Sequence, residues 1–236
     1  MIQSSDYLFE KFVTDENNIF SYSVANEAAK NPGKKYNPVF LYGEVSSGKT
    51  HLLHSIMYYI QDNNPDLKVK YLSTEKFTND LINSIRNDKM DAFRKDYREN
   101  DVYLFDDIDF IEGKEITQEE LFHTFNSLYE SKKQMVFTSD RHPKNISTLP
   151  QKLRSRLKSG IVCEIKSIKP EIYIQHFLEN SRSLCSDLLE LIKINSDNIS
   201  KASNGDIRIL KGIIDRIIAY YDINGTQLTP DKFKES

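Results

Sequence analysis

The sequence predicts an α/β fold with a parallel five-stranded sheet flanked by helices, followed by a small all-helical domain. Three observations support this prediction. A glycine-rich octapeptide, residues 43–50, stands between an apolar segment and an amphipathic segment. Apolar segments of strand length alternate with helical patterns as far as about residue 165. From Pro170 onward, every apolar pattern has the spacing of a helix.

Short runs of branched and aromatic residues predict buried strands, and apolar residues three or four apart predict helices. The predicted strands are 38–42, 69–73, 102–105, 134–138 and 161–165, and the predicted helices between them are 49–62, 75–87, 89–98, 117–131 and 151–158. Later predicted helices are 170–184, 187–195, 198–203, 206–222 and 229–234. Because the pattern changes at Ser167-Ile168-Lys169-Pro170, we expect an α/β domain over 1–167 and a helical lid over 168–236.

The composition limits the classes of protein to which the sequence can belong. The chain has 236 residues, of which 39% are hydrophobic and 28% charged, as in ordinary globular proteins, and no apolar run is long enough for a membrane span. The first residues lack a signal-peptide pattern, and Cys163 and Cys185 are isolated, so we expect a cytoplasmic protein with reduced thiols. A net charge of −3 argues against bulk coating of duplex DNA but leaves a local basic groove open.

The octapeptide Gly43-Glu44-Val45-Ser46-Ser47-Gly48-Lys49-Thr50 has the G-x-x-x-x-G-K-T spacing of a phosphate-binding P-loop. Backbone N–H groups wrap the phosphates, Lys49 reaches the β- and γ-phosphates, and the Thr50 hydroxyl can ligate Mg²⁺. The strand before the loop and the helix after it point a helix N-terminus at the phosphates. We therefore expect ATP or ADP with Mg²⁺, bound by Gly43, Ser46, Ser47, Gly48, Lys49, Thr50 and His51.

Two further predicted strands end in polar residues. The strand 102–105 is followed by Asp106 and Asp107. After a P-loop, the first Asp holds Mg²⁺, usually through water, and the next acid can orient the attacking water. The strand 134–138 leads into Asp140, which can sense the γ-phosphate; an ordinary turn, or a helix cap by Ser139 or Asp140, is the alternative. The predicted catalytic residues here are Asp106, Asp107 and Asp140, and the predicted Mg²⁺ ligands are Thr50 and Asp106.

These motifs and several longer strings resemble the AAA+ domain of DnaA, the bacterial chromosomal replication initiator family. The similarity extends from about Tyr7 to Phe233. It implies an AAA+ P-loop ATPase with weak turnover, in which nucleotide acts as an assembly switch. ATP-bound subunits would join into a filament that engages single-stranded DNA during origin opening. The strings that carry the resemblance include Asn37-Pro38-Val39-Phe40-Leu41-Tyr42-Gly43, Tyr71-Leu72-Ser73-Thr74-Glu75-Lys76-Phe77-Thr78-Asn79, Gln118-Glu119-Glu120-Leu121-Phe122-His123-Thr124-Phe125-Asn126 and Leu153-Arg154-Ser155-Arg156.

The resemblance implies two arginine roles. Arg208, in Gly205-Asp206-Ile207-Arg208, matches a lid arginine that touches the phosphates. Arg156 matches an arginine finger that acts in trans on the nucleotide of a neighbouring subunit. A guanidinium suits that task because it is always charged and forks onto two oxygens. From spacing alone, a solvated basic helix face over 152–158 would be the simpler interpretation.

The resemblance also implies contacts with DNA and with the base. Residues 75–98 match an initiator-specific helix pair that lines a channel for single-stranded DNA, where Ile82 and Lys114 match contact positions. Plain core packing is the alternative for Ile82. Asn18 matches a residue near the adenine, although it could instead cap a helix from Ile19.

Some features depart from the family pattern. Glu44 replaces a glycine, Lys152 an arginine and Ile116 an arginine at a single-strand contact, so we expect weaker contacts there. The sequence ends near Ser236, where the initiator continues into a helix-turn-helix domain that reads duplex origin DNA; we expect either a fragment or a stand-alone relative. The main alternative function is a regulatory adaptor that stimulates hydrolysis by the initiator. A helicase loader and a small-molecule kinase are further alternatives, and the replicative helicase or regulators are possible partners.

Overall fold

The structure is a computed structural model that describes residues 7–181 and 184–224. These residues form two compact units. The first comprises the described residues up to Glu44 and Gly48–Lys166, and the second comprises Val45–Ser47 with the described residues from Ser167 onward. The predicted helix 229–234 lies outside the described residues. Within them, no helix is both long enough and apolar enough to cross a lipid bilayer.

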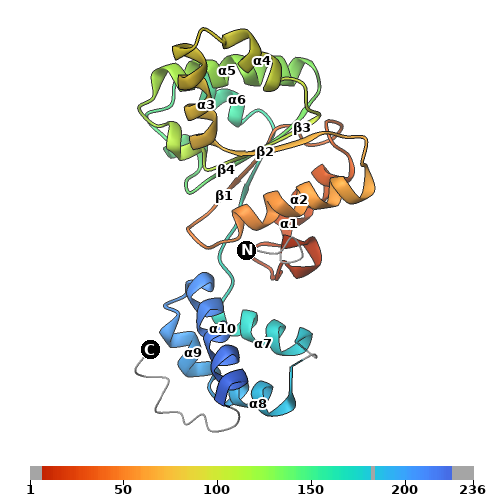
Figure 1. The fold of residues 1–236 in the computed structure, drawn as a ribbon, viewed down its shortest axis with the longest axis vertical. Coiled ribbons are helices and arrows are strands. Elements are labelled where there is room, and N and C mark those ends of the chain that lie inside the picture. The colour runs from red at the N-terminus through yellow and green to blue at the C-terminus, as the bar shows by residue number, and fades with distance from the viewer. Residues whose placement is uncertain (1–6, 182–183, 225–236) are drawn as a thin grey trace. The chain divides into compact units, whose positions relative to one another are not determined.

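The first unit is built on a five-stranded parallel sheet, which confirms the predicted fold class (Figure 1). The strand order β2-β3-β4-β1-β5 brings the carboxyl ends of β3, β4 and β1 side by side at one edge of the sheet. Ligands of open parallel sheets bind at such an edge, so this order determines which residues can share a site. The strands are β1 (Val39–Tyr42), β2 (Val69–Ser73), β3 (Val102–Asp106), β4 (Gln134–Ser139) and β5 (Ile161–Glu164).

Helices cover both faces of the sheet (Figure 1). Successive strand residues point to opposite faces, so β1 contributes Val39 and Leu41 to one core and Phe40 to the other. The first core packs against α1 (Ile19–Lys30) and α2 (Lys49–Asn63). The second core includes the stacked rings of Phe105 and Phe137, whose centroids are 4.8 Å apart. Its covering helices are α3 (Thr74–Arg86), α4 (Met90–Asp96), α5 (Glu115–Glu130) and α6 (Gln151–Leu157).

Three 3₁₀ helices that lie wholly within the described residues were absent from the sequence prediction because a single turn has no periodic pattern to recognise. They are η2 (Phe9–Lys11), η3 (Ile108–Ile111) and η4 (Pro143–Asn145). The helix α1 was also missing from the predicted helices, apart from its possible start at Ile19. The predicted helix boundaries otherwise hold to within a few residues. At α3, the strand β2 ends at Ser73, whose hydroxyl accepts a hydrogen bond from Lys76 N at 3.2 Å, so one residue ends the strand and caps the helix.

The described part of the second unit from Ser167 onward contains the helices α7 to α10, packed around their own apolar core (Figure 1). Leu188, Ile192, Leu210 and Ile214 lie at its centre, each with at most 1% of its surface exposed. The predicted helix 170–184 is too long, because the helix ends at Asn180 and Ser181 leaves helical geometry with ψ of 42°. The helices are α7 (Pro170–Asn180), α8 (Ser186–Ile194), α9 (Ser196–Ala202) and α10 (Ile207–Asn224).

Asp101 ties the amino-terminal ends of three strands together. Its carboxylate accepts a hydrogen bond from Lys68 N at 3.0 Å and from Lys133 Nζ at 2.7 Å. The hydrogen bond from Lys133 and that from the Lys68 backbone lower the pKa of the Asp101 carboxyl below its usual value. A lowered folded-state pKa means that this stabilisation is present above the unfolded pKa and is lost as the pH falls through the folded pKa.

We therefore expect Asp101→Asn to lower the free energy of unfolding at neutral pH by up to about 1 kcal/mol, the scale of a partly exposed ion pair. The difference between the parent and the variant should shrink as the pH falls below about 4, where the parent's carboxyl is protonated in the unfolded chain. Urea unfolding at neutral and acidic pH measures this. A difference that stays constant with pH would contradict the assigned role of the Asp101 charge.

Candidate functional site

The P-loop joins the end of β1 to the start of α2. Its backbone passes through two left-handed residues, Ser46 with φ of 69° and Gly48 with φ of 99°. Glycine takes such values without strain, and a Cβ atom at position 48 would lie 2.6 Å from the Phe12 ring. Both the backbone and the adjacent ring therefore require the second glycine. Because α2 begins at Lys49, its unpaired amino-terminal N–H groups face this loop, as in phosphate-binding sites.

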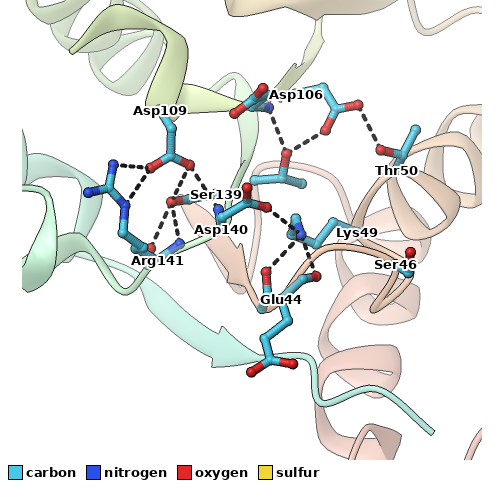
Figure 2. Close-up of polar contacts among 12 residues, drawn as sticks. Glu44, Ser46, Lys49, Thr50, Asp106, Asp109, Ser139, Asp140 and Arg141 are labelled. Atoms are coloured by element: carbon cyan, nitrogen blue, oxygen red, sulfur yellow. Dashed lines mark hydrogen bonds and ion pairs between the residues drawn. The ribbon is translucent and has the colours of Figure 1, made fainter. Parts of the chain in front are cut away.

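Three oxygen atoms hold the Lys49 ammonium (Figure 2). Its Nζ donates to Gly43 O at 2.7 Å and to Glu44 O at 2.8 Å, and it pairs with Asp140 Oδ1 at 2.9 Å. Only 12% of the Lys49 side chain is exposed. The lysine is therefore fixed between the P-loop backbone and the end of β4. The Glu44 carboxylate points away from Lys49 (Figure 2), so only its backbone contributes here.

Asp106 ends β3 and receives hydrogen bonds from three hydroxyl groups. Thr50 Oγ1 donates to its Oδ2 at 3.0 Å, Tyr71 OH to the same oxygen at 2.8 Å, and Thr138 Oγ1 to its Oδ1 at 2.5 Å. The Thr50 hydroxyl and the Asp106 carboxylate therefore converge, as the sequence predicted. Hard oxygen donors of this kind suit Mg²⁺, which protein sites hold through one or two side chains plus phosphate oxygens. These residues fit the ion that the motif implies.

Asp107 turns the chain sharply after β3. Its φ is 58°, in the left-handed region, and its backbone N donates to Thr138 Oγ1 at 2.9 Å. Burial raises the pKa of the Asp107 carboxyl above its usual value, and the charges of Asp109, Asp140 and Asp106 raise it further, while Lys49 lowers it. A carboxyl group in such surroundings has an increased affinity for a proton, which is the property required of a general base.

The segment after β4 combines a side-chain turn with a contact to the P-loop. Arg141 N donates to Ser139 Oγ at 2.9 Å. The backbone here therefore forms an ordinary turn, which was one of the alternatives for this segment. The alternative of a helix cap is wrong, because the side chain that caps η4 is His142, which accepts from Lys144 N at 3.0 Å. Asp140 instead directs its carboxylate to Lys49.

Asn18, predicted near the base, lies on the amino-terminal segment, and His51, predicted to bind nucleotide, lies on the first turn of α2. His51 Nε2 lies 2.9 Å from Leu8 O, and its ring meets Phe12 edge-on. Asn18 is 1% exposed; its amide donates to Val13 O at 3.0 Å and accepts from Asp15 N at 2.9 Å. The alternative of an Asn18 cap is therefore wrong, because the side chain closes the loop before α1 and makes no cap hydrogen bond. The base contact of Asn18 and nucleotide binding by His51 stay predictions.

Arg156 lies on α6, with its side chain exposed. Among residues 7–181 and 184–224, no carboxylate lies within 4 Å of its guanidinium, so no internal partner neutralises it there. A cavity of about 280 Å³ elsewhere along α6 does not involve Arg156. The residues that line this cavity are Lys144, Gln151, Arg154, Ser155 and Lys158.

The predicted DNA contacts lie on neighbouring elements of the first unit. Ile82, on α3, is 40% exposed and Ile85 is 44% exposed, so the alternative of core packing for Ile82 is wrong. The buried face of α3 uses Phe77 and Leu81 instead. Lys114 precedes α5, and its ammonium lies 3.0 Å from the centre of the Phe110 ring.

Arg208 belongs to the second unit, in the first turn of α10. Its backbone N donates to Asp206 Oδ1 at 2.8 Å, which secures the start of the helix. The Ser46 and Ser47 side chains belong to the P-loop, where Ser47 is 6% exposed. A contact between the Arg208 guanidinium and a nucleotide phosphate stays a prediction, because Arg208 belongs to the second unit and the sheet belongs to the first.

Sequence reasoning did not identify three residues that organise the site. Thr138 bridges Asp106 and Asp107, Tyr71 binds the carboxylate of Asp106, and Asp109 binds the segment that carries Asp140. The available signal was the polar Thr138 directly after the apolar residues 135–137 of this strand. Nothing in the sequence distinguishes the hydroxyl of Tyr71 from that of any other strand tyrosine.

Comparisons with known proteins agree with this geometry. A family model for the bacterial DnaA ATPase domain matches residues 3–164. The chromosomal replication initiator protein DnaA of Deinococcus radiodurans is 44% identical over 222 residues, which cover 92% of this chain and 46% of that protein.

Solved structures of DnaA proteins are also similar to this chain. Domain III of the Thermotoga maritima replication initiation protein DnaA is 39% identical, with a TM-score of 0.85, over 97% of this chain and 94% of that chain. A replication initiator DnaA bound to AMPPCP and single-stranded DNA is 31% identical, with a TM-score of 0.78, over 94% and 66% of the two chains.

This chain spans about half the length of the initiator proteins that it matches. The match nevertheless includes the P-loop, both carboxylates after β3 and the segment after β4. On the extent of this match, the chain belongs to the bacterial DnaA ATPase domain family.

Proposed function

We propose that this chain is the ATP-binding and slowly hydrolysing AAA+ domain of a chromosomal replication initiator, which self-assembles when ATP is bound and then engages single-stranded DNA during origin opening. The observation that carries the proposal is the convergence of Lys49, Thr50, Asp106 and Asp140 at one edge of the sheet. The relative bound to AMPPCP and single-stranded DNA supports both ligands. Residues 1–167 would bind the nucleotide, and 168–236 would form its lid.

The chain's own residues account for nucleotide binding. The P-loop N–H groups and the Lys49 ammonium would take the phosphates. Thr50 and Asp106 would hold Mg²⁺, which on binding neutralises charge on the β- and γ-phosphates. Tyr71 and Thr138 keep the Asp106 carboxylate in one orientation. In hydrolysis, Asp107 would orient and deprotonate the attacking water, since its surroundings favour proton uptake.

Residues on the surface would couple ATP binding to assembly and to single-stranded DNA. Arg156, which pairs with no carboxylate of the described residues, is available to reach the γ-phosphate held by a neighbouring copy. Binding of ATP would then favour assembly, and hydrolysis would reverse it. The exposed Ile82 and the Lys114 ammonium would meet bases and backbone of single-stranded DNA. Duplex origin DNA would be read only by a separate helix-turn-helix domain, with the replicative helicase or regulators as further partners.

Calorimetric titration of the purified protein with ATP in the presence of Mg²⁺ tests the proposal. We expect saturable binding with one nucleotide per chain, and weaker binding when Mg²⁺ is removed with a chelator. We also expect binding of a single-stranded oligonucleotide that requires ATP and weakens with rising salt, because the contacts are to phosphates. Circular dichroism confirms that the titrated protein is folded. A folded protein that takes up no adenine nucleotide would refute the proposed function.

A further inference from the structure

Asp109, in η3, binds the last residue of β4, Ser139, and the two residues that follow it, Asp140 and Arg141 (Figure 2). Its Oδ2 accepts hydrogen bonds from Ser139 Oγ and from Asp140 N, both at 2.8 Å. Its Oδ1 accepts from Arg141 Nη2 at 3.0 Å and from Arg141 Nε at 3.3 Å. Only 15% of the Asp109 side chain is exposed. One carboxylate thus joins the end of β3, through η3, to the end of β4.

The segment held in this way carries the carboxylate that meets the P-loop lysine. Asp109 anchors the backbone N of Asp140, and the side chain of Asp140 then reaches Lys49 Nζ at 2.9 Å. Within the part of the chain that the structure describes, Lys49 is the one side chain that pairs with this carboxylate. The Asp140 side chain is 50% exposed, so packing does not hold it. Its backbone anchor therefore determines where the carboxylate lies.

The turn itself does not supply this anchor. Arg141 N donates to Ser139 Oγ at 2.9 Å, which closes the turn but leaves Asp140 N without a partner from the turn. Glu112 does not supply it either. Its carboxylate pairs with the Arg141 guanidinium and accepts from Thr148 Oγ1 at 2.9 Å, and it makes no hydrogen bond to Ser139 or Asp140. Asp109 alone links the guanidinium to the Asp140 backbone.

We propose that Asp109 is a positioning residue of the nucleotide site, which sets the place of Asp140 relative to the terminal phosphate and is itself held by Arg141. The inference rests on the proposed function, since it gives Asp109 a part in ATP recognition and hydrolysis. Asp109 touches no substrate. Its charge also lies near Asp107, and a cycle with Asp140→Asn separates that influence from the positioning of Asp140. Substitution of Asp109 should therefore affect ATP recognition and hydrolysis, which involve the γ-phosphate, and should leave ADP affinity nearly unchanged.

Asp109→Asn is a suitable variant because it keeps the size of the side chain and removes one acceptor oxygen. A carboxylate accepts on both oxygens, whereas an amide accepts on one and donates from the other. Either the two donors from Ser139 and Asp140, or the two from Arg141, must then face an NH₂ group. The link between Arg141 and the Asp140 backbone is broken in both orientations.

A double-mutant cycle with Asp140→Asn tests the proposal. The measurements are the single-turnover rate of ATP hydrolysis and the separate affinities for ATP and ADP. We expect Asp109→Asn to slow hydrolysis about tenfold, as the loss of one positioned group does, and to change ADP affinity less than about twofold. In the Asp140→Asn background, Asp109→Asn should have no further effect on the rate. Glu112→Gln is the matched control, because it takes one carboxylate from the same guanidinium and should behave like the parent.

Independent, multiplicative effects of the two substitutions would overturn the proposal, as would a parent-like rate for folded Asp109→Asn. If thermal melting shows that Asp109→Asn does not fold, Ser139→Ala replaces it in the cycle, because it removes one of the bonds to Asp109; an effect that persists without Asp140 again overturns the proposal. If the proposed function were wrong, the parent protein itself would bind no ATP, and this result distinguishes that failure from failure of the Asp109 proposal.

Discussion

Lys49→Ala is expected to weaken ATP binding by at least about a hundredfold. Charge-assisted hydrogen bonds contribute about 1.5–3 kcal/mol each, and this ammonium is the one P-loop side chain placed to meet the β- and γ-phosphates. In the structure its Nζ already lies among Gly43 O, Glu44 O and Asp140 Oδ1, so the charge is fixed where phosphate oxygens would arrive. Calorimetric titration with ATP and Mg²⁺ measures the loss.

Lys34→Ala provides a control for the loss of one positive charge, because Lys34 is an exposed residue on the loop before β1, whereas the P-loop follows the carboxyl end of that strand. It should bind ATP like the parent. Circular dichroism and thermal melting should show that Lys49→Ala remains folded, since its ammonium serves the loop and not the apolar core. If folded Lys49→Ala bound ATP with the parent's affinity, residues 43–50 would not be a phosphate-binding loop.

Arg156→Ala is expected to bind ATP with the parent's affinity but to lose ATP-dependent oligomers. The guanidinium is exposed on α6 without a carboxylate partner within the described residues, so its removal should leave its own subunit intact. In GTPases an arginine finger is worth roughly 10³–10⁵ in rate, so any ATP turnover that depends on assembly should fall steeply. Analytical ultracentrifugation with ATP, with ADP and without nucleotide measures the assembly.

Two further variants separate charge from geometry. Arg156→Lys keeps the charge but loses the planar fork, and it should recover little assembly. Lys158→Ala removes a neighbouring charge that lines the cavity along α6, and it should assemble like the parent. Assembly by Arg156→Ala to the parent's extent would show that the match to an arginine finger is mistaken.

The fold was predictable because its signals are local. The strands are short segments rich in branched and aromatic residues, and α2 and α5 repeat their buried residues at helical spacing. The one-turn helices η2, η3 and η4 carry no such repeat, so sequence reasoning missed them. The end of α7 was misplaced for the same kind of reason, since nothing in the sequence near Asn180 marks a helix end as a glycine or proline would.

The candidate site likewise has residues that the sequence predicts and residues that only the structure reveals. The amino-acid sequence alone determined the phosphate loop, with Lys49 and Thr50, and the acidic pair Asp106–Asp107, because each is a contiguous motif whose spacing encodes its geometry. Only the tertiary structure decided that Tyr71 and Thr138 orient Asp106 and that Asp109 holds the backbone of Asp140. These contacts join β2, β3 and β4 across the sheet. They follow from strand order and register, which depend on packing among residues far apart in the chain and not on any one segment.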